Sequence, residues 1–162
     1  HRDTRFSKDK SPYRDHMWLL FRRGGETREN AAMFWFELAP ERVEWGLGFW
    51  DNNRPAMEAL RKRMREKPDE VVKALTDARV PDEGLDIYGD RYQRMAIPPG
   101  LPQTLKEIYP CKEFYIKRTD VPLQTAYSKD LITRCSQDLL RLKPVYQLLR
   151  RAADEGMAAL EG

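Results

Sequence analysis

The chain has 162 residues, of which 41% are hydrophobic and 34% charged, and its formal net charge is +3. This length is typical of one domain with one hydrophobic core, so we expect a single domain over residues 1–162. No apolar stretch is long enough to cross a bilayer and no secretory leader pattern is visible, so we expect neither a membrane protein nor a secreted one. Cys111 and Cys135 lie far apart without metal-type spacing, which favours a reduced, cytoplasmic compartment.

Positive charge is concentrated at the start of the chain. Residues 1–30 contain eight Lys and Arg against five Asp and Glu, whereas residues 31–162 contain twenty-one of each kind. A local basic cluster on an otherwise balanced protein predicts one site for an anionic ligand. A surface that coats nucleic acid would be basic over more of the chain.

The first elements are short. Residues 2–6 alternate as the end of a strand, and the polar segment Ser7–Pro12 predicts a loop. The apolar run within His16–Phe21 stops at Gly24-Gly25, and its brevity favours a strand that is buried on at least one face.

A β-hairpin is the clearest pattern in the chain. Residues 32–39 and 43–50 both alternate between apolar and other side chains, and they are joined through Ala39-Pro40-Glu41-Arg42. If the apolar residues of both strands share one face, the register follows. That register places Leu38 opposite Val43, Phe36 opposite Trp45 and Phe34 opposite Leu47.

The same register determines the second face of the hairpin. It pairs Glu37 with Glu44, Trp35 with Gly46 and Met33 with Gly48. Two glycines on one face leave a shallow trough or room for a large side chain, and Trp35 is expected to lie over Gly46.

Helices dominate the rest of the chain. We expect helices from Pro55 to about Glu66, from Pro68, near 104–109, and from Ser128 to the C-terminal region, with short strands within 85–97 and 112–117. Pro144 should kink the long C-terminal helix or split it in two. The order of elements predicts an α+β fold, an antiparallel sheet with a meander that includes the hairpin and with helices packed mainly on one face.

The first candidate site is the basic cluster at the start of the chain. It comprises Arg2, Arg5, Lys8, Lys10 and Arg14. Arginine grips carboxylate or phosphate with two parallel hydrogen bonds and lysine adds a point charge, so this cluster could bind a phosphorylated small molecule. The alternative is an internal salt-bridge network with the neighbouring Asp3 and Asp9.

The second candidate is the pair Glu37 and Glu44, which are weak candidates for catalysis. Like charges opposite each other in a sheet are unfavourable, so a cation, a metal ion or a shared proton should compensate them, and Arg2 or Arg5 could be that cation. The alternative is that both carboxylates are hydrated at the open end of the hairpin. With His1 and His16 as its two histidines, the chain offers no His-rich metal site, and we predict none.

Two further features are weaker. Trp50 shares the glycine face and could contact a ligand, although tryptophans at alternating spacing are more often part of a core. The basic run Arg61–Lys67 points in several directions around its helix, which is typical of a solvated surface and only secondarily of a nucleic-acid contact.

Several separated motifs resemble one family. The stretch Arg2–Tyr13 is similar to the signature R-D-x-R-F-S-K-D-K-x-P-Y of a family of conserved hypothetical proteins, a domain of unknown function. Gly46–Trp50, Pro98–Gly100 and Lys112–Tyr115 resemble later motifs of that family in the same order, although the family commonly has Lys where this chain has Pro99. The resemblance implies a mostly helical segment before the signature, so we expect this sequence to cover only the later part of a family domain, and the resemblance transfers no catalytic residues.

Three functions remain open at this point. The first is a domain that binds an anionic ligand through the basic cluster, with or without catalysis. The second is a nucleic-acid-binding module that adds the helix of Arg61–Lys67, and the third is a structural or interaction domain. No motif identifies a cofactor, a reaction or an oligomeric state.

Overall fold

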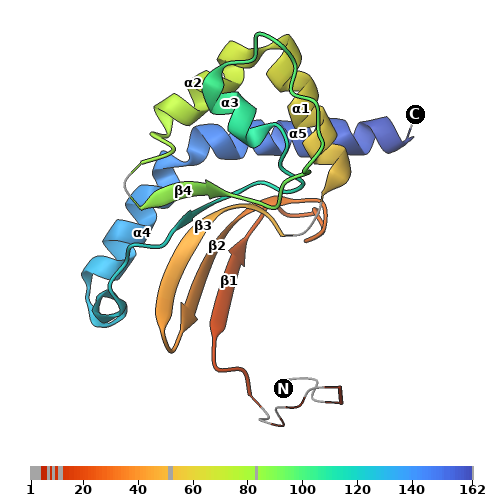
Figure 1. The fold of residues 1–162 in the computed structure, drawn as a ribbon. Helices are drawn as coiled ribbons and strands as arrows, with labels where there is room; N and C mark the ends of the chain where they lie inside the picture. The colour runs from red at the N-terminus through yellow and green to blue at the C-terminus, as the bar shows by residue number, and fades with distance from the viewer. Residues whose placement is uncertain are drawn as a thin grey trace.

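The computed structural model describes residues 5, 6, 8, 10, 13–50, 53–82 and 84–161, and its elements confirm an α+β fold (Figure 1). The strands are β1 (Met17–Phe21), β2 (Ala32–Ala39), β3 (Arg42–Phe49), β4 (Leu85–Tyr88) and β5 (Tyr115–Arg118). The helices are α1 (Arg54–Glu66), α2 (Pro68–Asp77), α3 (Gln103–Ile108), α4 (Asp130–Arg141) and α5 (Lys143–Glu161), with a 3-10 turn η1 (Leu123–Tyr127).

The five strands form one antiparallel sheet in the order β1-β2-β3-β5-β4. β1, β2 and β3 form the meander, and β5 pairs with β3 while β4 follows outside it. The predicted hairpin register is confirmed at every pair, including Glu37 with Glu44 and Trp35 with Gly46. β3 begins at Arg42, one residue earlier than expected, because Ala39 and Arg42 already pair across the turn.

The main core lies between one face of the sheet and the helices. α5 packs against α1, α2, β2 and β3, and α4 packs against β3. Asn53 begins α1 by accepting a hydrogen bond from the Ala56 backbone N–H, and the inward residues Met57 and Leu60 are fully buried. The alternating apolar side chains of the hairpin therefore face this helical layer, where Phe34 stacks on Tyr146 of α5 at 4.9 Å between ring centroids.

The C-terminal helix is divided in two, as Pro144 predicts. α4 ends at Arg141 and α5 begins at Lys143, immediately before the proline. A proline lacks the backbone N–H of a helical hydrogen bond and its ring clashes with the preceding turn, which explains the break. The division lets α4 follow the sheet while α5 crosses α1 (Figure 1). Among the described residues, no helix is both long and apolar enough to cross a membrane.

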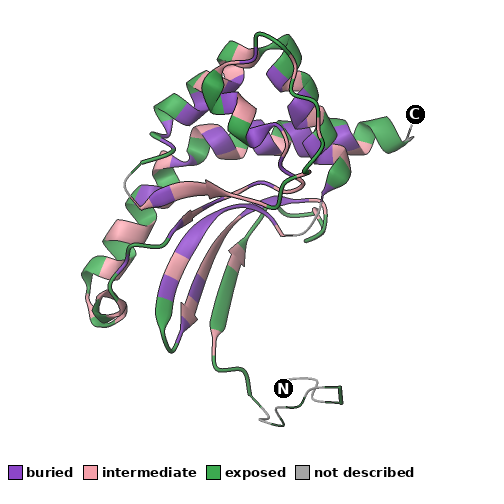
Figure 2. Ribbon diagram, in the orientation of Figure 1, coloured by how far each residue is buried: buried purple, intermediate pink, exposed green. Residues whose placement is uncertain are grey.

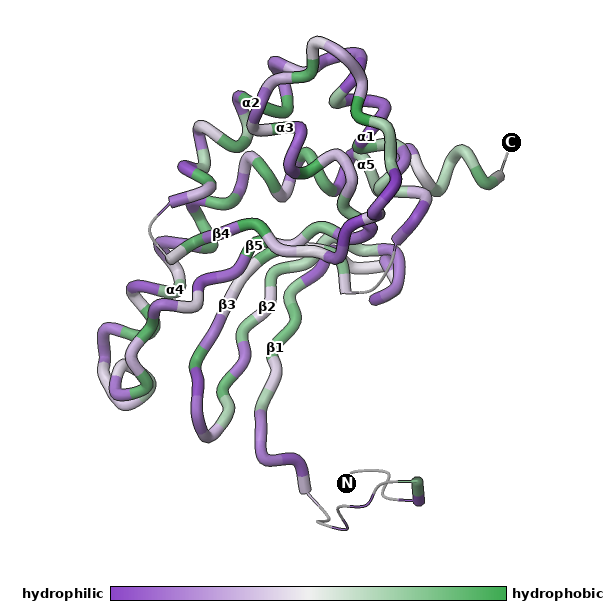
Figure 3. Tube along the Cα trace, in the orientation of Figure 1, coloured by the Kyte–Doolittle hydropathy of each residue, from purple (hydrophilic) through white to green (hydrophobic). Residues whose placement is uncertain are grey.

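β1 differs from its prediction. It is the outermost strand beside β2, and Met17, Leu19 and Phe21 on its helix-side face are 44% to 52% exposed. Figure 2 shows this strand as largely exposed, and Figure 3 shows hydrophobic residues along it. The expected burial on one face is therefore wrong for the described residues, because α4 and α5 pack over β2 and β3 rather than over β1.

The start of the chain is described in part. Arg5 and Phe6 lie in a turn rather than in the strand predicted over residues 2–6. Arg2, Asp3 and the other predicted strand and loop positions at 1–4, 7, 9, 11 and 12 lie outside the described residues.

Candidate functional site

A pocket of about 540 Å³ opens on the face of the sheet that bears Gly46 and Gly48. We call it the glycine-face pocket. Its lining comes entirely from strands and the residues next to them: Trp18, Met33, Trp35, Glu37, Arg42, Glu44, Gly48, Phe49, Trp50, Glu113, Tyr115 and Lys117. β1, β2, β3 and β5 each contribute, so the pocket depends on the order of strands in the sheet.

Neighbouring atoms approach both glycines of this face closely, and Gly48 lines the pocket. A Cβ atom at Gly46 would lie 2.0 Å from the backbone oxygen of Ile116 and 3.0 Å from the ring of Trp35. A Cβ atom at Gly48 would lie 2.3 Å from the Cβ of Tyr115. The expectation that Trp35 lies over Gly46 is confirmed, and neither position has room for a side chain.

Aromatic side chains form one wall. Trp18 and Trp50 meet edge to face with their ring centroids 4.6 Å apart, which is a favourable geometry for two aromatic rings. The guanidinium of Arg28 lies 4.5 Å from the ring centroid of Trp50. Trp50 was predicted as a ligand contact, and the structure places it in the pocket together with Trp18 and Trp35.

A chain of four charged groups forms a second wall, which adjoins the aromatic one because Trp18 pairs with Glu37 in the register of β1 and β2. Arg42 Nη2 donates to Glu37 Oε1 at 2.6 Å, and Arg42 Nε lies 3.7 Å from Glu44 Oε2. Lys117 Nζ lies 3.3 Å from both carboxylate oxygens of Glu44. Two cations therefore offset the repulsion between the opposed carboxylates, and Glu37 is buried with 5% exposure despite its charge.

Sequence reasoning missed Arg42 and Lys117 as these cations. Arg42 shares the face of Glu44 because the two residues are two positions apart on β3, and Lys117 lies on the face opposite the predicted inward residue Ile116. Alternation could have found both side chains. What it could not supply was the pairing of β5 with β3, which brings Lys117 beside Glu44.

Tyrosines continue the site toward the edge of the sheet. Tyr115 stacks on Tyr88 of β4 at 5.7 Å between ring centroids, and Lys117 Nζ lies 5.2 Å from the Tyr88 ring centroid. Burial raises the pKa of Tyr115 above its ordinary value, and the nearby Lys117 opposes part of that rise. The phenol is therefore neutral at ordinary pH, and Tyr115 lines the pocket.

The described members of the basic cluster do not contribute to the pocket lining. Arg5, Lys8, Lys10 and Arg14 are exposed, and none of them lines the glycine-face pocket. Arg14 lines a separate shallow hollow that also includes Tyr127. Glu37, Glu44 and Trp50 are thus brought together in one site, whereas the four described members of the basic cluster lie outside its lining, and Arg2 is outside the described residues.

The basic run of α1 is largely used within the protein. Arg61 is 2% exposed and donates to the backbone oxygens of Tyr109 and Cys111, which corrects the expectation of a solvated surface at that position. Arg63 pairs with Glu70 and Glu155. These contacts attach α1 to α2, α5 and the segment after α3.

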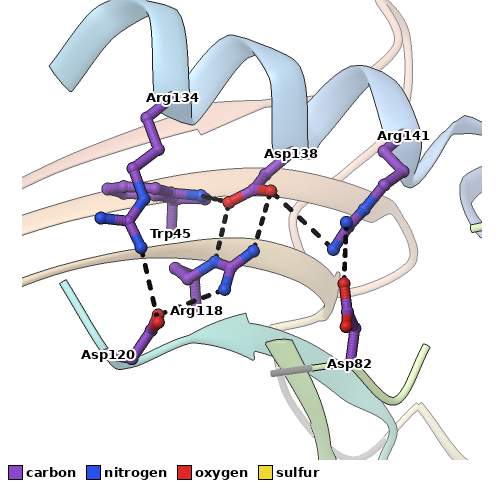
Figure 4. A network of polar contacts seen from close by, with 7 residues as sticks. All are labelled: Trp45, Asp82, Arg118, Asp120, Arg134, Asp138 and Arg141. Atoms are coloured by element: carbon purple, nitrogen blue, oxygen red, sulfur yellow. Dashed lines mark hydrogen bonds and ion pairs between the residues drawn. The ribbon is translucent and has the colours of Figure 1, made fainter. Parts of the chain in front are cut away.

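A second charged network lies on the helix-side face of the same strands, and we call it the α4 clamp (Figure 4). Asp138 of α4 accepts hydrogen bonds from Trp45 Nε1 at 2.9 Å and from Arg118 Nε and Nη2 at 2.8 and 3.0 Å. Asp120 links Arg118 to Arg134, and Asp82 pairs with Arg141. The hydrogen bonds that Arg118 donates to Asp138 raise the pKa of the Arg118 guanidinium. No group of three His, Cys, Asp or Glu side chains within the described parts of the chain is placed to hold a metal ion.

Comparison with known proteins gives a family and no activity. The family model described as "Conserved hypothetical protein (DUF2461)" matches residues 1–148. The chain belongs to this family. No curated protein and no solved structure matches this DUF2461 chain, so its function has to be argued from the pocket and its residues.

Proposed function

We propose that this DUF2461 chain binds a small organic molecule with a flat ring in the glycine-face pocket. The observation that carries the proposal is the composition of the lining, in which Trp18, Trp35 and Trp50 adjoin a wall of paired charges. A volume of about 540 Å³ is in the range of pockets that bind small ligands. Apolar walls with a few placed polar groups are typical of such pockets.

The two walls would contact different parts of the ligand. A flat ring can stack on the exposed parts of Trp18 and Trp50, where it removes apolar surface from water. Hydroxyl, amino or carbonyl groups on that ring can exchange hydrogen bonds with Glu37, Arg42 and Lys117. Because ion pairs already hold these three side chains in place, little conformational entropy is lost on binding.

The hypotheses drawn from the sequence differ in how well they agree with the geometry of the pocket. An anionic ligand at Arg5, Lys8, Lys10 and Arg14 stays a prediction for a second location, since these residues lie outside the pocket lining. A nucleic-acid surface on α1 has less support, because Arg61 and Arg63 are engaged by the protein itself. A catalytic role for Glu37 and Glu44 also stays a prediction, and it would act in the same pocket.

A thermal-shift screen tests the proposal. The panel contains indole, adenosine, phenyl compounds with acid, alcohol or amine groups, glucose 6-phosphate and a short oligonucleotide. We expect ring compounds to raise the melting temperature of the wild-type chain and to lose about tenfold in affinity in Trp18→Ala.

The control variant is Tyr127→Ala, which removes an aromatic side chain that is 88% exposed and distant from the pocket lining. It should bind ring compounds as the wild type does. No shift with any ring compound, or a shift that is unchanged in Trp18→Ala, would refute the proposal. A shift with the phosphorylated sugar or the oligonucleotide alone would favour the basic cluster instead.

A further inference from the structure

The charges that line the glycine-face pocket do not balance. Three carboxylates, those of Glu37, Glu44 and Glu113, line it together with two cations, Arg42 and Lys117. Arg42 and Lys117 are both paired with the glutamates of the hairpin. Among the ion pairs of the described residues, none includes Glu113, so the unbalanced negative charge is at that side chain.

Glu113 lies in the bend two residues before β5, next to the aromatic part of the site. Glu113, Tyr115 and Lys117 are each two positions apart, and all three line the pocket. Glu113 immediately precedes Phe114, whose backbone oxygen accepts a hydrogen bond from Phe49 N–H at 3.3 Å. Trp50 is the next residue after Phe49 and lines the same pocket. A carboxylate without a cation partner is thus placed near tryptophan and tyrosine rings.

The protein already binds its own cations with this combination of groups. Lys117 Nζ lies 3.3 Å from Glu44 and 5.2 Å from the ring centroid of Tyr88. Arg28 lies over Trp50 at 4.5 Å and within 4.0 Å of Glu29. In both cases a carboxylate and an aromatic face hold one cation, which is the arrangement that recognises ammonium groups in general.

We propose that the ligand of the glycine-face pocket is an organic cation, a ring compound with an ammonium or guanidinium group that pairs with Glu113. The proposal rests on the proposed function of this pocket and names the class of ligand. An anion at the same place would have to displace Glu37 or Glu44 from Arg42 and Lys117, and it would meet Glu113 at close range. Both effects disfavour a carboxylate or phosphate there.

Three ligands that share one ring and differ in charge test this inference. Benzylamine, benzyl alcohol and benzoate are titrated into the wild-type chain, and the dissociation constants are measured by calorimetry at pH 7. We expect benzylamine to bind about tenfold more tightly than benzyl alcohol, and benzoate to bind most weakly.

Two variants distinguish the effect of the Glu113 charge from the effect of removing any carboxylate from the protein. Glu113→Gln keeps the shape of the side chain and should remove the preference for benzylamine while the affinity for benzyl alcohol stays the same. Glu66→Gln removes an exposed carboxylate at the end of α1, outside the pocket lining, and should preserve the preference.

The outcomes distinguish the two proposals. Benzyl alcohol or benzoate binding as tightly as benzylamine overturns the cation inference and leaves the pocket as a binding site. A benzylamine preference that persists in Glu113→Gln also overturns it. If none of the three compounds binds, and the screen above finds no other ring compound, the proposed function itself fails.

Discussion

Neighbouring residues of β3 and β5 serve two different charged networks. On β3, Glu44 points to the glycine-face pocket and Trp45 to the α4 clamp. On β5, Lys117 belongs to the network of the pocket and Arg118 to the α4 clamp. One network is open to a pocket of about 540 Å³, while the other is closed between the sheet and α4, where Asp138 and Arg118 are each 7% exposed.

Because the two networks differ in burial, we expect one to stabilise the fold and the other to bind a ligand. In the α4 clamp, three hydrogen bonds satisfy a buried carboxylate, and removing Arg118 or Asp138 takes the two strongest hydrogen bonds from the other buried charge. In the pocket wall, Arg42 is about half exposed and water can replace a lost partner. We therefore expect changes in the clamp to unfold the protein and changes in the pocket wall to alter its ligand.

The largest expected effect is on the clamp. Asp138→Ala should lower the free energy of unfolding by about 3 kcal/mol, because the buried Arg118 guanidinium loses two hydrogen bonds and keeps its contact with the partly exposed Asp120. Urea unfolding measures the change. Gln137→Ala, an exposed position on the same helix, is the control and should change stability by less than about 0.5 kcal/mol.

A double variant tests the cause of that loss. Replacing Arg118 by Met in the Asp138→Ala background should recover part of the stability, since it removes the buried charge that lost its two hydrogen bonds to Asp138. If the double variant is less stable than Asp138→Ala alone, the penalty does not come from the charge of Arg118.

The next largest effect is expected at Gly48 in the pocket lining. Gly48→Ala should cost about 1–3 kcal/mol, because the new Cβ would lie 2.3 Å from Tyr115 Cβ and 2.7 Å from the Phe114 backbone oxygen. Gly24→Ala is the matched control, since no atom lies within 4 Å of its added Cβ. Equal melting temperatures for the two variants would contradict the close approach of β5 to β3.

A smaller effect is expected for the pocket wall. Arg42→Ala should cost about 1 kcal/mol, discounted for the exposure of Arg42, because Glu37 and Glu44 then oppose each other with one cation fewer. The loss should shrink when Glu44→Gln is added or when the salt concentration is raised. Unfolding curves at low and high salt provide the measurement, and a loss as large as that of Asp138→Ala would remove the contrast between the two networks.

The last effect depends on pH. Burial, with a further contribution from the Asp138 carboxylate, raises the pKa of Cys135 on α4 from 9.0 to about 11. Because the pKa is raised in the folded state, the protonated Cys135 thiol contributes to stability fully below pH 9.0. That contribution is lost as the pH rises to about 11. The free energy of unfolding should therefore fall across this range, and Cys135→Ala should make that fall less steep. An identical slope in the variant would contradict the assignment.

The sequence predicted the pocket face better than it predicted the clamp. Alternation over eight residues and a short connection leave one register for the hairpin, so Glu37, Glu44 and Gly46 were assigned to one face correctly. Trp50 followed from the same alternation. These are local consequences of a two-residue period, and no knowledge of the rest of the fold was needed.

Alternation along a strand could not predict the long-range contacts. Asp138 meets Trp45 across 93 positions of the chain and Arg118 across 20, and no periodicity specifies those pairs. The exposure of β1 was missed for a similar reason, since an apolar strand appears buried until the helices are placed over other strands. The basic cluster was identified from its charge alone, and its role stays a prediction.

The side-chain N–H signals of the four tryptophans test the central claim most directly. Trp18, Trp35 and Trp50 line the pocket, while Trp45 donates to Asp138 in the clamp. In a two-dimensional nitrogen–proton NMR titration with benzylamine, assigned by single Trp→Phe variants, the three pocket signals should move with one dissociation constant and the Trp45 signal should stay in place. Movement of Trp45 as large as that of the other three, or no movement of the three pocket signals, would contradict the division between a binding face and a stabilising face.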